Sequence, residues 1–180
     1  MANLLTTVRL LLVVPVSWAF ADPQLLKPEL LMGFIFIAIA TDYFDGKIAR
    51  ATHTESARGM LFDHGTDFLF VSSALAAMAS VGAIHPLLPF LIIIAFSQYV
   101  LDSYFLFRQK QLRMSFLGRW NGIFYFAPLL CFSATRLEFM AALTSSLQEV
   151  TELLGRVLIL STMASIIDRG LAPFYGLSQK

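Results

Sequence analysis

Long apolar segments recur along this chain, and they constrain its fold more than any other feature. A helix that crosses a membrane needs about 20 mostly apolar residues. Six segments approach that length, although charges near their ends shorten several of the apolar runs: 4–22, 29–50, 59–81, 86–108, 116–134 and 150–169. Their regular spacing predicts an all-α, polytopic integral membrane protein with six transmembrane helices. The length of 180 residues suits a single domain over residues 1–180.

The composition favours a membrane protein over a soluble one. Hydrophobic residues make up 57% of the chain and charged residues 14%, whereas an average soluble domain has about 45–50% apolar and about 25% charged residues. A soluble core of this size would need more charged surface than the sequence supplies. The formal net charge of only +1 argues against a general nucleic-acid binder.

Two segments allow alternative interpretations. The first 21 residues also resemble a secretory signal peptide, with an apolar stretch followed by small residues before Asp22. Because the rest of the chain is polytopic, we expect a retained first helix instead. Segment 137–149 is either a short interfacial helix or an extension of the last span.

The basic residues predict the orientation of the bundle. Loops on the cytoplasmic side of a membrane carry an excess of Lys and Arg. With the N- and C-termini in the cytoplasm, ten basic residues fall on or near that side: Arg9, Lys47, Arg50, Arg58, Arg108, Lys110, Arg113, Arg119, Arg169 and Lys180. Only Lys27 and Arg136 fall clearly outside. The opposite orientation would violate the rule.

Four aspartates interrupt this apolar pattern within one predicted helical hairpin. Asp42 and Asp45 are three residues apart, and Asp63 and Asp67 are four apart, so each pair shares one helical face. Like charges about 4 Å apart repel by about 4 kcal/mol at an effective dielectric constant near 20. Proton uptake, pairing with Arg50 or Arg58, or bound cations would each relieve this repulsion.

Bound cations explain the cluster best. Carboxylate oxygens suit hard cations such as Mg²⁺ or Mn²⁺, and the absence of a matching His or Cys set argues against zinc. Four carboxylates suffice for two ions that clamp a phosphoryl transfer. Gly46 and Gly59 lie beside the acids and allow close approach of a ligand or a neighbouring helix. His64 follows Asp63 directly and points about 100° away along the helix, which favours a packing or supporting role.

The spacing of these residues resembles the signature of the CDP-alcohol phosphotransferase (CDP-alcohol phosphatidyltransferase) family. Eight residues match at fixed offsets: Asp42, Asp45, Gly46, Ala49, Arg50, Gly59, Asp63 and Asp67. Members of this family transfer a phosphatidyl or related group from a CDP-linked donor to an alcohol and release CMP. The resemblance therefore implies a membrane enzyme of phospholipid biosynthesis that uses CDP-diacylglycerol.

The resemblance also implies roles for individual residues. The four aspartates would hold two divalent cations, Mg²⁺ or Mn²⁺, and Asp67 would be the general base. Gly46, Ala49, Arg50 and Gly59 would line the CDP site. A homodimer in the inner (cytoplasmic) membrane, with its active site facing the cytoplasm, is implied as well.

The acceptor alcohol stays open among several candidates. The predicted cytoplasmic segment 107–122 carries four basic residues: Arg108, Lys110, Arg113 and Arg119. They would bind a phosphorylated acceptor such as glycerol 3-phosphate, although they also suit orientation and anionic lipid. The N-terminus, with Asn3, Thr6 or Thr7, and Arg9, is similar to that of phosphatidylglycerophosphate synthases. The sequence FDHGTDF looks more like choline and ethanolamine phosphotransferases. Serine, inositol, inositol phosphate, choline and ethanolamine are therefore alternative acceptors.

A cation transporter is the rival from another class of protein, since acids inside a membrane also mark ion pathways. A permeation path would spread polar residues across the membrane, whereas these acids share the cytoplasmic half of one hairpin. A purely structural membrane subunit leaves the four acids unexplained. The sequence therefore favours an enzyme.

Overall fold

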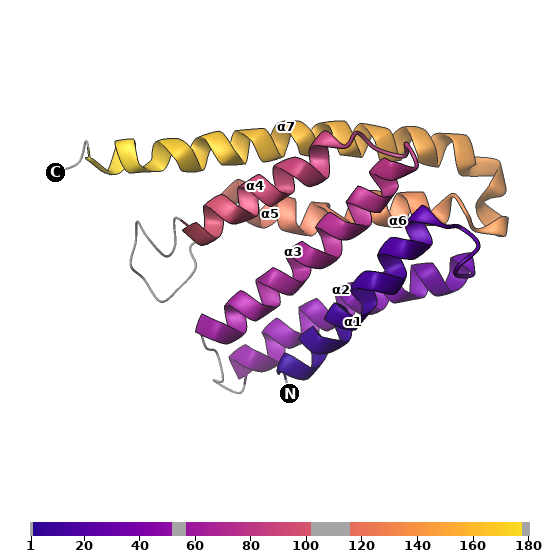
Figure 1. The fold of residues 1–180 in the computed structure, drawn as a ribbon, viewed down its shortest axis with the longest axis horizontal. Helices are drawn as coiled ribbons and strands as arrows, with labels where there is room; N and C mark the ends of the chain where they lie inside the picture. The colour runs from indigo at the N-terminus through magenta and orange to yellow at the C-terminus, as the bar shows by residue number, and fades with distance from the viewer. Residues whose placement is uncertain (1, 52–56, 102–115, 178–180) are drawn as a thin grey trace.

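The computed structural model is a bundle of packed helices (Figure 1). It describes residues 2–51, 57–101 and 116–177. These ranges contain no strand, which agrees with the predicted all-α class. The helices in chain order are α1 (Ala2–Ala21), α2 (Pro28–Ala51), α3 (Ala57–Ser80), α4 (Leu87–Leu101), α5 (Phe116–Phe124), α6 (Phe126–Ala134), the short 3₁₀ helix η2 (Glu138–Leu143) and α7 (Thr144–Leu177).

The helices run alternately between two ends of the bundle (Figure 1). The first residues of α1, α3 and α5 and the last residues of α2, α4 and α7 lie toward the left of the view. The opposite ends of these helices lie further to the right, where α6 also ends. This alternation is compatible with successive crossings of a membrane.

Two described stretches are long and apolar enough to cross a membrane by length and composition alone. They are Leu4–Ala21 in α1 and Glu138–Leu171, which comprises η2 and most of α7. Leu87–Leu101 is apolar but shorter. Helices α2 and α3 have 24 residues each, which is sufficient length, but each carries two of the four aspartates. The number of six crossings stays a prediction.

The fifth predicted span, 116–134, is divided between α5 and α6 at Tyr125, although the backbone of Tyr125 itself keeps helical dihedral angles. The backbone N–H of Tyr125 still donates to the carbonyl of Asn121 at 2.9 Å, as in a helix. One turn later Pro128 has no N–H, so the carbonyl of Phe124 loses its helical partner. A proline inside the predicted span therefore accounts for the break between α5 and α6.

Segment 137–149 combines the two alternatives that the sequence left open. Its first part forms η2, and its second part forms the beginning of α7 at Thr144. Helix α7 has 34 residues, so it exceeds the predicted span 150–169 at both ends.

The apolar core holds one half of α1, α2 and α3 together. Its buried residues are Val16, Ala19, Phe20, Leu31, Ile35, Ala38, Phe70, Val71, Ala74, Leu75, Met78, Ile84, Leu88, Ile92, Tyr125, Leu129 and Leu158. In these three helices the core occupies the C-terminal half of α1, the N-terminal half of α2 and the C-terminal half of α3. The remaining halves converge at the other end of the bundle, and they carry the four aspartates.

Arg136 fastens α1 at the core end. Its Nη1 donates to the carbonyl of Ala19 at 2.6 Å and its Nη2 to that of Phe20 at 3.0 Å. Its guanidinium also lies over the rings of Phe20 and Phe132. Because the last carbonyls of a helix lack partners within the helix, Arg136 serves as a C-terminal cap for α1.

Candidate active site

The acidic residues meet because α1 packs against both α2 and α3. Asp42 and Asp45 lie on α2, and Asp63 and Asp67 lie on α3. The i, i+3 and i, i+4 spacings place each pair on one helical face. The predicted convergence of the two pairs is present among the described residues, and the polar half of α1 closes it on a third side.

Arg9 of α1 lies at the centre of this convergence. Its side chain is fully buried, and its Nη1 lies 3.3 Å from the Oδ1 atoms of both Asp42 and Asp63. The same nitrogen contacts the carboxylate of Asp67. Three carboxylates from two helices therefore share one guanidinium nitrogen. A buried charge requires such partners, because an isolated charge inside a protein is costly.

Asp45 has a different partner. Its carboxylate accepts a hydrogen bond from the hydroxyl of Thr6, which lies on α1 one turn before Arg9. Both residues are buried, with relative exposures of 3% and 2%. One face of α1 therefore supplies a polar contact to every one of the four acids.

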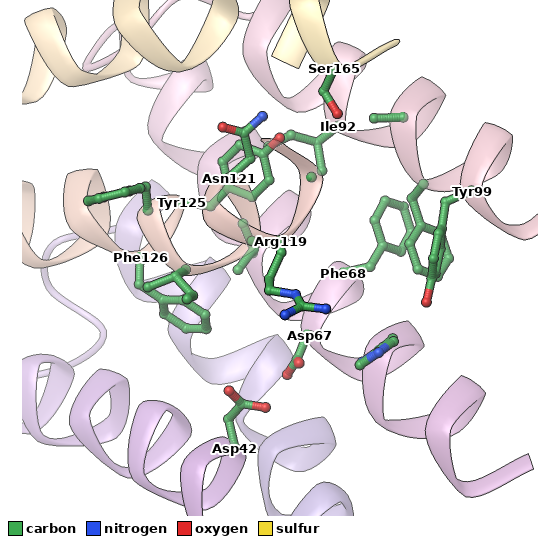
Figure 2. A pocket seen from close by; sticks show the side chains of 18 of the residues that line it. Asp42, Asp67, Phe68, Ile92, Tyr99, Arg119, Asn121, Tyr125, Phe126 and Ser165 are labelled. Carbon is green, nitrogen blue, oxygen red and sulfur yellow. The ribbon is translucent and has the colours of Figure 1, made fainter. Parts of the chain in front are cut away.

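A cavity of about 610 Å³ opens beside the acids (Figure 2). Asp42 and Asp67 belong to its lining, and Arg119 at the start of α5 belongs to it as well. Figure 2 shows the guanidinium of Arg119 directed toward the carboxylates of Asp42 and Asp67. Asp63 and Asp45 are not among the lining residues. A ligand in the cavity would therefore meet an acidic and a basic side chain together.

Aromatic side chains form one wall of the cavity. The rings of Phe68 and Phe96 stack with centroids 4.2 Å apart, and Tyr99 lies next to Phe96 at 6.0 Å. The guanidinium of Arg169 lies over the ring of Tyr99 at 5.1 Å. Arg169 also lines the cavity, so α7 contributes a second cation to the walls.

Polar contacts join α5 and the residue that follows it, Tyr125, to α7 at the wall of the cavity. The amide oxygen of Asn121 accepts a hydrogen bond from the hydroxyl of Ser161 at 2.6 Å. The hydroxyls of Tyr125 and Thr162 lie 2.8 Å apart. These contacts hold α5 in place, and α5 carries Arg119 two residues before Asn121.

The donor set of the cluster fits a divalent cation. One ligand atom each from Asp63, His64 and Asp67 can be chosen so that all lie within 4.8 Å of one another. The oxygens of Asp42 and Asp63 also converge on a single nitrogen of Arg9, so they already surround a cation. Carboxylate oxygens are the ligands that Mg²⁺ and Mn²⁺ prefer.

His64 lies closer to the cavity and the acids than its position along the helix indicated. It lines the cavity, and its Nδ1 lies 3.7 Å from the Oδ2 of Asp63. Its ring also neighbours that of Tyr99, with centroids 6.2 Å apart. This surrounding is compatible with a supporting role beside the acids.

The remaining predicted site residues differ in what the structure describes. Gly46 on α2 and Gly59 on α3 are half-buried. The side chains of Ala49, Arg50 and Arg58 lie outside the described part of the chain. Of the four basic residues predicted for the acceptor, Arg119 lines the cavity. The other three are outside the described residues: Arg108, Lys110 and Arg113.

Sequence analysis did not assign Arg9, Thr6, Tyr99 or Arg169 to this site. Arg9 carried a signal, since it is the one charged residue in the sequence of α1. A lone cation inside an apolar helix calls for a partner. The aromatic wall carried no such signal, because phenylalanine and tyrosine are frequent throughout the chain.

A sequence model of the family CDP-alcohol phosphatidyltransferase matches residues 1–166 of the chain. The matched range includes the four aspartates, Arg9 and Arg119, and it ends within α7 before Arg169. Comparison with curated proteins and with solved structures gave no match.

Proposed function

Because this chain belongs to the CDP-alcohol phosphatidyltransferase family, we propose that it transfers a phosphatidyl group from CDP-diacylglycerol to an alcohol and releases CMP. The family is membrane-associated, and its members are transferases that generally depend on divalent cations. The observation that carries the proposal is the convergence of Asp42, Asp63 and Asp67 beside a cavity that Arg119 also lines.

The acids would hold the ions. Asp42, Asp45, Asp63 and Asp67 would bind two divalent cations, Mg²⁺ or Mn²⁺. Bound there, the ions would offset the charge of the diphosphate and stabilise the departing phosphate oxygen. Gly46, Ala49, Arg50 and Gly59 would line the CDP site, where a guanidinium suits phosphate oxygens.

Asp67 would act as the general base. Its carboxylate faces the cavity, so it can take the proton of an acceptor hydroxyl that binds there. The hydroxyl oxygen forms a bond to the phosphorus that carries the diacylglycerol. The bond from that phosphorus to the oxygen of CMP breaks, and CMP leaves with the electron pair. The proton remains on Asp67 until it passes to solvent.

The position of Arg119 favours an acceptor that carries a phosphate. Its guanidinium lines the same cavity as Asp42 and Asp67 and is directed toward their carboxylates (Figure 2), so it can bind the phosphate of an acceptor whose hydroxyl reaches Asp67. We propose glycerol 3-phosphate as this acceptor. Serine, inositol, inositol phosphate, choline and ethanolamine are the alternatives. Arg108, Lys110 and Arg113 would assist in binding the phosphate.

The setting of the reaction follows from its donor. The acyl chains of CDP-diacylglycerol would stay in the bilayer while the headgroup enters the cavity. We propose that the protein lies in the inner membrane with this cavity open to the cytoplasm, and that two copies form a homodimer.

Product analysis with a panel of acceptors tests the proposal. Purified protein in nanodiscs would receive CDP-diacylglycerol, Mn²⁺ and one acceptor at a time, and the lipid products would be identified by mass. We expect phosphatidylglycerophosphate from glycerol 3-phosphate. Turnover with another acceptor would reassign the substrate, and no lipid product with any acceptor would contradict the proposed reaction.

A further inference from the structure

Arg9 is a buried charge whose contacts are incomplete. Its Nη1 serves Asp42, Asp63 and Asp67. Its Nε and Nη2 are buried as well, and they have no hydrogen-bond partner among the described residues. A guanidinium offers five N–H donors in a rigid fork, so this arrangement uses only part of the group.

This pattern differs from that of an arginine that only holds helices together. Arg136 illustrates the structural case, because two of its nitrogens donate to carbonyls at 2.6 and 3.0 Å and its face lies on aromatic rings. Arg9 leaves Nε and Nη2 without partners within the described part of the chain and gathers three carboxylates on Nη1. It contacts the same carboxylates that would bind the metal ions.

We propose that Arg9 is a positioning residue that acts as a built-in cation of the metal site. It holds the acids of α2 and α3 together before metal binds, and it limits how many divalent ions the site takes up without a diphosphate. This proposal rests on the metal role of the acids in the proposed function.

Charge accounting gives the physical reason. Arg9 makes ion pairs with three of the acids, whereas Arg119 makes none with them among the described residues. The four carboxylates and Arg9 together carry three negative charges. One divalent cation leaves one negative charge, whereas two would leave a net positive charge in a partly buried place. A diphosphate supplies both negative charge and oxygen ligands, as phosphates commonly do for Mg²⁺ in proteins. The second ion should therefore bind together with the diphosphate of the donor.

Removal of Arg9 should change this order of binding. In Arg9→Met the four carboxylates could accept two divalent ions without a net positive charge. Like charges repel strongly at an effective dielectric constant near 20, so loss of the guanidinium should tighten Mn²⁺ binding by at least about tenfold. An arginine with a merely structural role would leave metal affinity unchanged or weakened when it is replaced.

Calorimetric titration of Mn²⁺ into the full-length protein in nanodiscs tests this inference. For wild type we expect one tightly bound ion alone and two in the presence of CDP as the probe. For Arg9→Met we expect two ions without CDP, and for Arg9→Lys, which keeps the charge, one. Arg136→Met is the matched control: it removes another buried arginine that contacts α1, and its metal stoichiometry should equal that of wild type.

The outcomes separate this inference from the proposed function. Two equally tight ions in wild type without CDP would overturn the role of Arg9, and so would a stoichiometry of one in folded Arg9→Met. Wild-type protein that binds neither Mn²⁺ nor CDP would instead contradict the proposed function. If Arg9→Met folds only when Mn²⁺ is present, the built-in cation is supported, since an external cation then replaces it. If Arg9→Met does not fold at all, the wild-type titration decides: one ion without CDP and two with CDP support the inference, and two ions without CDP overturn it.

Discussion

The hydroxyl of Thr6 on α1 donates a hydrogen bond to the carboxylate of Asp45 on α2, 39 residues further along the chain. Both side chains are buried. The contact fixes the polar end of α1 against α2, one turn away from Arg9. The acidic site is therefore built by three helices, and α1 supplies partners although none of the four acids lies on it.

Replacement of Thr6 by valine should destabilise the protein and weaken the site. The buried carboxylate of Asp45 would lose a donor, which costs about 1–3 kcal/mol for a group left without its partner. Thermal unfolding measures the loss of stability, and Mn²⁺ titration measures the effect on the acids. Thr6→Ser keeps the hydroxyl and should behave like wild type; a valine variant with unchanged stability would show that the contact contributes nothing.

Arg119→Gln should raise the KM for a phosphorylated acceptor and leave the KM for CDP-diacylglycerol nearly unchanged. Loss of a hydrogen bond to a charged group costs about 1.5–3 kcal/mol, which corresponds to roughly a 10- to 150-fold change. Initial rates of CMP release at varied acceptor concentration give both constants. Arg156→Gln is the control, because Arg156 pairs with Glu152 on exposed surface. Equal KM values for the acceptor in wild type and Arg119→Gln would exclude Arg119 from acceptor binding.

Gly122→Leu should reduce activity without loss of stability. Gly122 lines the cavity, and a Cβ added there meets no atom within 4 Å, so we expect a larger side chain to fit without a clash and to narrow the proposed substrate cavity. Replacement of a helical glycine removes a penalty of about 0.5–1 kcal/mol, so the melting temperature should stay equal or rise.

The matched control for this variant is Gly33→Leu. Gly33 on α2 also has open space around its Cβ position, and it does not belong to the cavity lining. Activity should fall in Gly122→Leu alone. A fall of the same size in both variants would mean that the cavity is not where substrate binds.

Arg136→Met should lower the melting temperature and spare the chemistry. It removes two hydrogen bonds from a charged donor to the carbonyls of Ala19 and Phe20, each contributing about 1.5–3 kcal/mol. Activity at a temperature well below unfolding should match wild type. A loss of activity in folded protein would imply that the core end of α1 is coupled to the acids.

The grouping of the acids into two pairs was predictable because the two members of each pair lie on the same helix. The i, i+3 and i, i+4 spacings of Asp42 with Asp45 and of Asp63 with Asp67 fix which side chains share a face. Arg119 was a candidate for acceptor binding because it begins a span next to a basic segment. It lines the cavity, and its role in acceptor binding stays a prediction. The comparison of the chain with its family bears out the resemblance that these spacings carried.

The partners on α1 were not predictable in the same way. Arg9 lies 54 residues before Asp63, and their contact depends on how α1 packs against α3, which no local spacing specifies. The cavity walls depend on packing as well, because Phe68 and Phe96 come from different helices. The break at Tyr125 had a local cause in Pro128, but a proline inside an apolar segment does not by itself show whether the helix bends or ends.

Metal-dependent release of CMP from CDP-diacylglycerol tests the role of the acidic site most directly. Wild type, Asp67→Asn and the exposed-acid control Glu152→Gln would be compared with glycerol 3-phosphate as acceptor, with Mn²⁺ and after its removal by a chelator. We predict release by wild type and Glu152→Gln that stops with the chelator, and a fall of about 10²- to 10⁴-fold in Asp67→Asn, the range for loss of a general base. Undiminished release by Asp67→Asn, or release that persists without divalent ions, would contradict the assignment of these acids to catalysis.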